Sequence, residues 1–249
     1  MRVETARASS QKSALPSRPG RHTLLTQAKN LCVSTERRPR SILSGPLRGI
    51  QMNLELRTQA QLYLGLYERE TFPWIRRLSR GINSGADIGV AEGEFTLFLL
   101  TRTGAAQVWA FEPNPAVRPL FEANLQVNGM ENTPRLNIVE KFAGDGAGPG
   151  EMRLDDMAGE LQQPCFIKVD AEGAEGRILR GSSGLDILED VRWLVETHSQ
   201  ALEIECLQIL RERGYHTEVI RQARWRKVLP DYRPLEHNRW LAAWREPVR

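Results

Sequence analysis

Short apolar segments alternate with longer helical patterns through most of the chain, and no other feature limits the fold as strongly. Such alternation is typical of an α/β fold with a mostly parallel, doubly wound sheet and helices on both faces. The apolar run 165–169 suits a strand that is covered on both sides. The expected strands are 86–88, 108–111, 136–139, 165–170, 191–195, 215–220 and 239–244, and the expected helices between them are 94–101, 115–127, 174–180 and 201–213.

The residues that directly follow the expected strands are nearly all acidic, small or polar. In an open α/β sheet, ligands bind outside the carboxyl ends of the strands. We therefore expect a ligand site at this edge of the sheet. The residues there are Asp87 to Gly93, Glu112 to Asn114, Asp145, Asp170 to Glu175 and Glu196 to His198.

The first of these loops, Asp87-Ile-Gly89-Val-Ala-Glu92-Gly93, has two glycines spaced four residues apart. A dinucleotide site requires G-x-G-x-x-G and places a pyrophosphate on the helix N-terminus. Asp87 and Glu92 would repel that anion, whereas they suit a ligand with an ammonium or sulfonium group. Glu112, at the end of the next strand, can accept hydrogen bonds from two ribose hydroxyls. The pattern favours a cationic nucleoside such as S-adenosylmethionine.

Residues 1–51 differ from the rest of the chain in charge and pattern. They contain ten Lys or Arg and two Glu, a balance of +8, so the other 198 residues carry −5 of the total of +3. Rich in Ser, Arg, Pro and Gly, they are expected to form a disordered tail. Three interpretations stay open: a non-native extension with translation starting at Met52, an organelle-targeting segment, or an electrostatic arm for nucleic acid or an anionic membrane. We expect leading helices over 52–80 and the ligand-binding domain over 81–249.

Composition excludes several classes of protein. No run of about 18 apolar residues occurs, so we expect no membrane span. Three widely spaced cysteines make neither a disulfide framework nor a zinc site. Free thiols favour a reducing compartment, and we expect a cytoplasmic protein. The oligomeric state is open.

Seven short blocks, in order along residues 60 to 200, carry a resemblance to a known family. They are Tyr63-Leu-Gly65-Leu-Tyr67-Glu68, Asp87-Ile-Gly89-Val-Ala-Glu-Gly93, Ala110-Phe-Glu112-Pro-Asn114, Asn124-Leu-Gln-Val-Asn128, Leu154-Asp-Asp156, Phe166-Ile-Lys168-Val-Asp170-Ala-Glu172-Gly-Ala-Glu175 and Glu196-Thr-His198. These blocks resemble the FkbM family of S-adenosylmethionine-dependent methyltransferases. The resemblance implies a class I methyltransferase fold, Rossmann-like, with a seven-stranded sheet whose last strand is antiparallel. It also implies O-methylation, often of sugars, glycolipids or natural products. In the first loop, family members often carry Asn in place of Glu92.

The resemblance also implies which residues hold the cofactor. Asp87, Gly89 and Gly93 would frame its methionine part, and Glu112 would hold its ribose. Glu68 either closes over the same site from the leading helices or is an exposed helix acid.

Two further residues have either a cofactor role or a local structural role. Asn114 either flanks the adenine or caps the helix started by Pro115, and the cap is favoured. Asp145 either meets the adenine amino group or forms the turn in Ala143-Gly-Asp145-Gly.

A hydroxyl acceptor has to lose its proton, so we expect a general base near the transferred methyl group. Asp170 is the favoured base, because it ends an apolar strand at the ligand edge, where a carboxylate without a partner would be costly. His198 is the second candidate, unless it only precedes the next helix. Glu175 can instead be the acid of a first helical turn. Asp170 with Glu196 or His198 also permits a divalent cation, magnesium or manganese rather than zinc, although no metal is favoured.

We therefore expect O-methylation of a hydroxyl on a sugar, a glycolipid or a small natural product. The basic and aromatic segment 221–233 is expected to be a solvated strand edge or an arm around an anionic acceptor rather than a nucleic-acid surface. Two other functions stay open. One is an RNA or protein methyltransferase that docks through the basic tail, and the other is a binding module that keeps the cofactor without catalysis.

Overall fold

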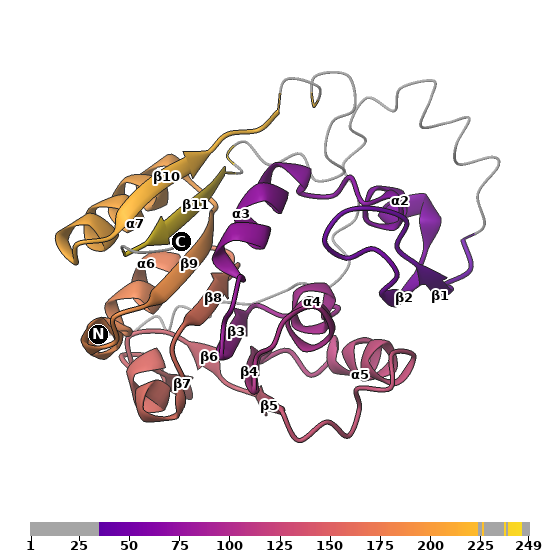
Figure 1. The fold of residues 1–249 in the computed structure, drawn as a ribbon, viewed down its shortest axis with the longest axis horizontal. Helices are drawn as coiled ribbons and strands as arrows, with labels where there is room; N and C mark the ends of the chain where they lie inside the picture. Colours follow the sequence, from indigo (N-terminus) through magenta and orange to yellow (C-terminus); the bar gives the residue numbers. More distant parts are fainter. Residues whose placement is uncertain (1–34, 224–225, 227–236, 238, 246–249) are drawn as a thin grey trace, which may run out of the picture.

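A seven-stranded sheet forms the centre of the computed structural model, which describes residues 35–223, 226, 237 and 239–245 (Figure 1). In spatial order the strands are β10 (His216–Ile220), β11 (Arg239–Trp244), β9 (Val191–Thr197), β8 (Cys165–Val169), β3 (Ser84–Ile88), β4 (Gln107–Phe111) and β5 (Leu136–Val139). Strand β11 is antiparallel to both of its neighbours, and every other pairing in this sheet is parallel. The expected mostly parallel sheet with an antiparallel last strand is confirmed.

Helices cover both faces of the sheet (Figure 1). On one face lie α3 (Phe72–Leu78), α4 (Glu94–Arg102) and α5 (Arg118–Gln126), and on the other lie α6 (Glu175–Arg180) and α7 (Gln200–Glu212). Successive side chains of a strand point to opposite faces. Phe166 of β8 accordingly packs in the core beneath α4, while Ile167 packs in the core beneath α6 and α7. The predicted core on each side of the sheet is confirmed.

Two local predictions between the strands need correction. Helix α5 begins at Arg118, three residues after the predicted start at Pro115, and Pro119 rather than Pro115 occupies its first turn. The glycine-rich segment after β5, whose composition predicts a loop or a hairpin, holds the short strands β6 (Phe142–Ala143) and β7 (Glu151–Met152). These strands pair in parallel, so the hairpin is wrong.

Three short 3₁₀ helices complete the described elements: η1 (Arg69–Thr71), η2 (Leu154–Glu160) and η3 (Ser183–Ile187). The adjacent acids Asp155 and Asp156 predict a helix N-terminus, and η2 begins there: the Asp156 side chain accepts a hydrogen bond from the Arg153 backbone. No helix in the described part of the chain has the length and apolar character needed to cross a bilayer.

The structure corrects the predicted tail over residues 35–51. Strand β1 (Arg38–Ser41) pairs antiparallel with β2 (Gln51–Leu54), and we call residues 35–54 the N-terminal hairpin. Ile42 and Ile50 are each only 1% exposed and join the core with residues of α4 and α5. Met52 lies inside β2, so it does not mark the start of the ordered chain. Residues 1–34 lie outside the described residues, and the three interpretations of the tail remain predictions for that part.

The leading helices are α2 (Leu56–Leu64), η1 and α3, and a residue from the far end of the chain holds them together. Arg226 is only 7% exposed and donates hydrogen bonds to Glu70 Oε1 at 2.8 Å and to Gln61 Oε1 at 2.8 Å. Burial raises the pKa of Glu70, but the hydrogen bonds from the Arg226 side chain and the Ala223 backbone together lower that pKa overall. Arg226 therefore has an internal structural role, whereas residues 224–225 and 227–233 of the predicted arm lie outside the described residues.

Candidate functional site

The loop after β3, residues 87–93, is the first part of the site. Asp87 is fully buried, and its Oδ2 accepts a hydrogen bond from Thr96 Oγ1 of α4 at 2.8 Å. Gly89 has a φ of +84°, and a Cβ there would lie 1.8 Å from the backbone oxygen of Asp170. Gly93 has a φ of +93°, and a Cβ there would lie 2.3 Å from the Phe121 ring. Both positions therefore require glycine, because a side chain would displace the loop from the sheet edge.

Glu112, directly after β4, holds this loop from the neighbouring strand. Its Oε2 accepts a hydrogen bond from the Ala91 backbone at 2.9 Å, and its Oε1 accepts one from the Asn114 backbone at 2.9 Å. Ala91 has a φ of +51°, which is unfavourable for a residue with a side chain. Each carboxylate oxygen has a second lone pair, so Glu112 can still accept hydrogen bonds from ribose hydroxyls.

A buried charge network links the ends of β3, β8 and β9. It consists of Asp87, Lys168, Asp170, Glu175, Glu196 and His198. The Lys168 Nζ lies 3.3 Å from Asp87 Oδ1 and 3.5 Å from Asp170 Oδ2, and it donates a hydrogen bond to the Gly89 oxygen at 3.1 Å. Burial alone would lower the pKa of Lys168, but Asp87 and Asp170 raise it above its ordinary value. Lys168 therefore stays charged and fixes both acids beside the glycine loop.

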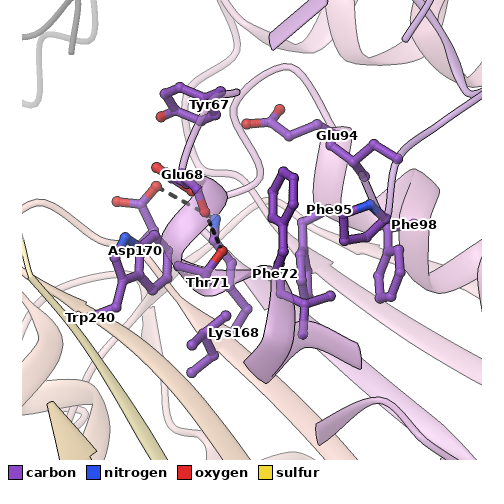
Figure 2. Close-up of a pocket in the computed structure, with 14 residues that line it drawn as sticks. Tyr67, Glu68, Thr71, Phe72, Glu94, Phe95, Phe98, Lys168, Asp170 and Trp240 are labelled. Carbon is purple, nitrogen blue, oxygen red and sulfur yellow. Dashed lines mark hydrogen bonds and ion pairs between the residues drawn. The ribbon is translucent and has the colours of Figure 1, made fainter. Parts of the chain in front are cut away.

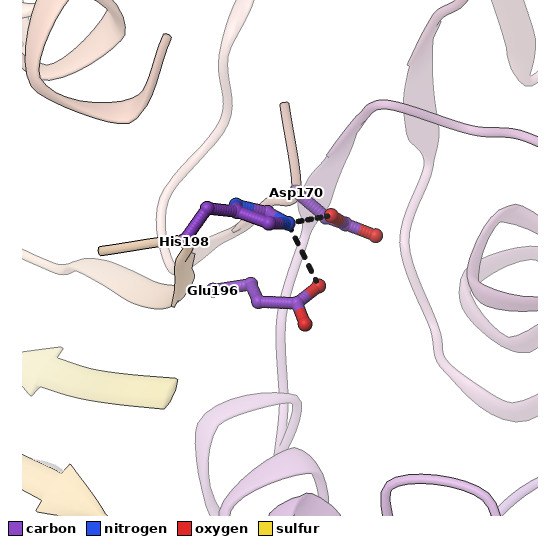
Figure 3. Close-up of side chains that lie close together, drawn as sticks. All are labelled: Asp170, Glu196 and His198. Carbon is purple, nitrogen blue, oxygen red and sulfur yellow. Dashed lines mark ion pairs between the residues drawn. The ribbon is translucent and has the colours of Figure 1, made fainter. Parts of the chain in front are cut away.

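His198 forms the other half of the network. Its Nδ1 lies 2.6 Å from Glu175 Oε1, and its Nε2 lies 3.6 Å from Asp170 Oδ1 and 3.8 Å from Glu196 Oε2 (Figure 3). Burial lowers the pKa of His198, but the hydrogen bond to Glu175 and the charge of Asp170 outweigh it, and the pKa rises above 6.5. Glu175 therefore pairs with His198 as well as opening helix α6.

Ligand atoms of Asp170, Glu196 and His198 all lie within 4.8 Å of one another. This spacing, with two carboxylates and one imidazole, suits a hard divalent cation. Glu175, on the far side of the ring, would then orient the histidine, as a carboxylate beyond a metal-bound histidine commonly does. The structure thus brings together the residues that the sequence offered for a metal.

A cavity of about 40 Å³ adjoins the network on the side of α3 and α4 (Figure 2). Aromatic side chains such as Phe72 and Phe95 line it, and four charged residues share it: Glu68, Glu94, Lys168 and Asp170. Glu68 lies at this cavity, and its closing over a cofactor remains a prediction. A space of this size is smaller than a nucleoside.

Two predicted cofactor residues are engaged in local contacts. The Asn114 side chain accepts a hydrogen bond from the Ala116 backbone at 3.0 Å, in the turn that precedes α5. The N-cap residue of α5 is Val117, so the prediction that Asn114 caps a helix started by Pro115 is wrong. Asp145 accepts hydrogen bonds from Arg177 Nη2 at 2.8 Å and from the Ala147 backbone at 3.2 Å. The bond from Arg177 lowers the pKa of Asp145. The structure supplies both residues with partners from the chain, and their contact with adenine remains a prediction.

Two residues of the site carry no assigned role in the sequence-based prediction. Lys168 is 7% exposed and stands opposite Asp87 in the parallel register of β3 and β8. In the sequence, a lysine inside an otherwise apolar strand could have indicated that Lys168 belongs to the site. Glu94, the first residue of α4, lies in the cavity, and its burial raises its pKa from 4.5 to about 7. The sequence around Glu94 did not indicate a site residue, because Glu94 looks like an ordinary acid in the first turn of a helix.

The chain is similar to known methyltransferases. Residues 141–217 match the family model described as the methyltransferase FkbM domain, which confirms the resemblance over that segment. The structure is similar to that of the methyltransferase FkbM from Methylobacillus flagellatus KT, with a TM-score of 0.51 and 19% identity over 65% of this chain. It is also similar to an rRNA methylase from Streptococcus thermophilus, with a TM-score of 0.50 and 11% identity over 72% of this chain. A comparison with curated proteins found no match.

The two solved structures differ in how much of their length is matched. The chain spans 43% of the Methylobacillus protein and 96% of the Streptococcus protein. At these identities the likeness concerns the fold, and the predicted class I methyltransferase fold is confirmed.

Proposed function

We propose that this chain, which carries an FkbM methyltransferase domain on a class I methyltransferase fold, methylates a hydroxyl group of a sugar, a glycolipid or a small natural product, with S-adenosylmethionine as donor. The observation that carries the proposal is the position of Asp170. Its backbone oxygen lies against Gly89 of the cofactor loop, and its carboxylate borders the cavity. One residue thus adjoins both the proposed cofactor site and a space that an acceptor group can enter.

The residues at the edge of the sheet fit S-adenosylmethionine. Glu112 presents a carboxylate for the ribose diol, and the glycine loop 87–93 borders the position for the methionine part. Asp87 and Glu92 have partners within the chain, since Lys168 lies 3.3 Å from Asp87 and Arg37 lies 2.9 Å from Glu92. Their charges therefore attract a cation less strongly than the sequence alone suggests. When bound, the cofactor supplies a methyl group on a positively charged sulfur, which an acceptor oxygen attacks in line.

Asp170 is the proposed base. Lys168 and His198 flank its carboxylate at 3.5 Å and 3.6 Å and hold it beside the cavity. His198 is less suited to the first proton transfer, because its raised pKa favours the form that already carries a proton. We assign it the task of holding Asp170 in place. Glu175 fixes the ring of His198 through Nδ1.

The test is a screen of sugars, glycolipids and hydroxylated natural products with S-adenosylmethionine that carries an isotopic label in its methyl group. We expect label in a hydroxylated acceptor with the wild type and with the control Asp156→Asn, an exposed acid in η2. Asp170→Asn should bind S-adenosylhomocysteine normally and turn over about 10² to 10⁴ times more slowly. Full turnover by Asp170→Asn would remove Asp170 from the chemistry, and label only in RNA or protein would refute the acceptor class.

A metal-assisted form of the same reaction is the second candidate, and the spacing of Asp170, Glu196 and His198 favours it. A divalent cation there would replace the base by lowering the pKa of the acceptor hydroxyl. Dialysis against a chelator separates the two forms. Activity that is lost and then restored by magnesium or manganese supports the cation, whereas activity that survives supports Asp170 acting alone.

Docking of RNA or protein through the basic tail is a separate alternative. A deletion of residues 1–51 would also remove most of the N-terminal hairpin, so the informative deletion ends at residue 34. RNA binding that depends on salt and is lost in this deletion would support docking. Cofactor binding without methylation of any acceptor would instead indicate a binding module.

A further inference from the structure

The cofactor loop contains a strained residue, Ala91, in a turn that the Gly93 backbone closes by donating to the Val90 oxygen at 2.9 Å. Ala91 adopts a left-handed conformation with a φ of +51°, immediately before Glu92 and Gly93. Such a conformation persists only where surrounding contacts hold it. Glu112 supplies one contact by accepting the Ala91 N–H. Several long-range side-chain contacts converge on the next residue, Glu92, at which this sequence departs from the family pattern.

Three different elements hold Glu92. Arg37, next to β1, donates from Nη1 to Oε2 at 2.9 Å and from Nη2 to Oε1 at 3.2 Å. Gln59 of α2 donates from Nε2 to Oε2 at 2.7 Å. Asn124 of α5 donates from Nδ2 to the Glu92 backbone oxygen at 2.8 Å. Both ends of Glu92 are therefore fixed by residues that lie far from it in the sequence.

These contacts close into a ring of four residues. Arg37 Nη1 also donates to the Asn53 backbone oxygen at 2.6 Å. Asn53, in β2, donates to Asn124 Oδ1 from its backbone at 2.8 Å and from Nδ2 at 3.0 Å. Asn124 is fully buried and completes the ring at Glu92. Just after the end of α5, the Asn128 side chain accepts a hydrogen bond from the Gln51 backbone N–H at 3.0 Å and donates one to the Gln51 backbone oxygen at 2.6 Å.

We infer that the N-terminal hairpin is part of the cofactor site and that Arg37 is a positioning residue, which acts through Glu92 to hold the loop 87–93 in its strained, binding-competent form. Arg37 and Glu92 keep 35% and 22% of their side chains exposed. An ion pair at this exposure adds little to the stability of the whole protein. We expect the ion pair between Arg37 and Glu92 to keep the loop 87–93 ordered instead. The role assigned to the loop depends on the proposed function.

The experiment compares Arg37→Ala with Arg38→Ala, which removes the same charge from an exposed neighbour with no hydrogen bond to the loop described here. Amide hydrogen exchange of residues 88–94 is measured without ligand, and the affinity for S-adenosylhomocysteine is measured by calorimetry. We expect faster exchange in the loop and a Kd about tenfold higher for Arg37→Ala only, with a melting temperature near that of the wild type. Arg37→Lys, which keeps one donor for Glu92, should restore part of the affinity.

Each outcome decides a different point. If amide exchange of residues 88–94 is unchanged in Arg37→Ala, Arg37 does not order the loop and the inference is refuted. Faster exchange with unchanged affinity overturns the positioning role. A wild type that does not bind S-adenosylhomocysteine refutes the proposed function, while the exchange data still decide whether Arg37 orders the loop. An equal loss of affinity for S-adenosylhomocysteine in Arg38→Ala would mean that only net charge matters and would also refute the inference.

Discussion

Glu94 is expected to make the stability of the protein depend on pH. Burial in the cavity raises its pKa from 4.5 to about 7, against the opposing charge of Lys168. Between these two values Glu94 binds more protons in the folded protein than in the unfolded chain, so its contribution to stability is fully present below pH 4.5 and is lost as the pH rises through 7. At 1.36 kcal/mol per pH unit the full shift corresponds to about 3 kcal/mol. Glu94 is only half-buried, so we expect about 1 to 3 kcal/mol.

The perturbation is Glu94→Gln, which keeps the shape of the side chain and cannot ionise. Urea unfolding at about pH 5 and pH 8 gives the free energy of unfolding for the variant, the wild type and the control Glu131→Gln, an exposed acid. We expect Glu94→Gln to be more stable than the wild type at about pH 8 and to lose less stability than the wild type between about pH 5 and pH 8. The reasoning is refuted if the wild type and Glu94→Gln change equally with pH, because Glu94 would then be ionised in the folded protein at little cost.

Three further predictions concern the loop and the hairpin. Glu112→Gln should raise the Kd for S-adenosylhomocysteine about tenfold or more, because an amide nitrogen cannot accept a hydrogen bond, and calorimetry showing an unchanged Kd would exclude the ribose contact. Ile50→Ala should lower the free energy of unfolding by about 2 to 5 kcal/mol in urea titrations, because the side chain is 1% exposed, whereas a residue of a disordered tail would show no effect. Gly89→Ala should lose cofactor binding and stability, while Gly129→Ala, which also has a positive φ but meets nothing within 4 Å, should lose only a little stability. Equal melting temperatures for these two variants would rule out the close approach to Asp170.

The sequence predicted the sheet well because its strands are short apolar runs between helical patterns. The segment 108–111 was predicted within one residue of β4, and the fixed geometry of an open α/β sheet then placed Glu112 and Asp170 at the ligand edge. The start of α5 was placed wrongly because both Pro115 and Pro119 suit a first helical turn. The Asn114 side chain accepts a hydrogen bond from the Ala116 backbone in a separate turn, so Pro115 lies before the helix and Pro119 lies in its first turn.

The N-terminal hairpin was not predicted, because a composition typical of disorder outweighed a weak strand-like alternation of apolar and polar residues. Ile50, Met52 and Leu54 alternate with polar residues, as a strand does, and they are 0% to 1% exposed. The segment before them is rich in Arg, Ser, Pro and Gly, which is typical of disorder. The contacts that order the hairpin come from Asn124 and Asn128, more than 70 residues away in the sequence. A local pattern contains no information about such partners.

The same limit applies to the acids at the edge of the sheet, and it changes what they imply. From the sequence, every acid at a strand end counts toward the recognition of a cation. In the structure, Asp87 pairs with Lys168, Glu92 with Arg37 and Asp145 with Arg177, so these acids are already balanced by neighbouring cations. The carboxylates of Asp170, Glu175 and Glu196 all surround the ring of His198, and Lys168 also lies 3.5 Å from Asp170. Negative charge is therefore concentrated at the ends of β8 and β9, beside the cavity. This position supports the proposal that an acid there removes the proton from the acceptor, whereas the cofactor contacts proposed for Asp87 and Glu92 depend less on their charge.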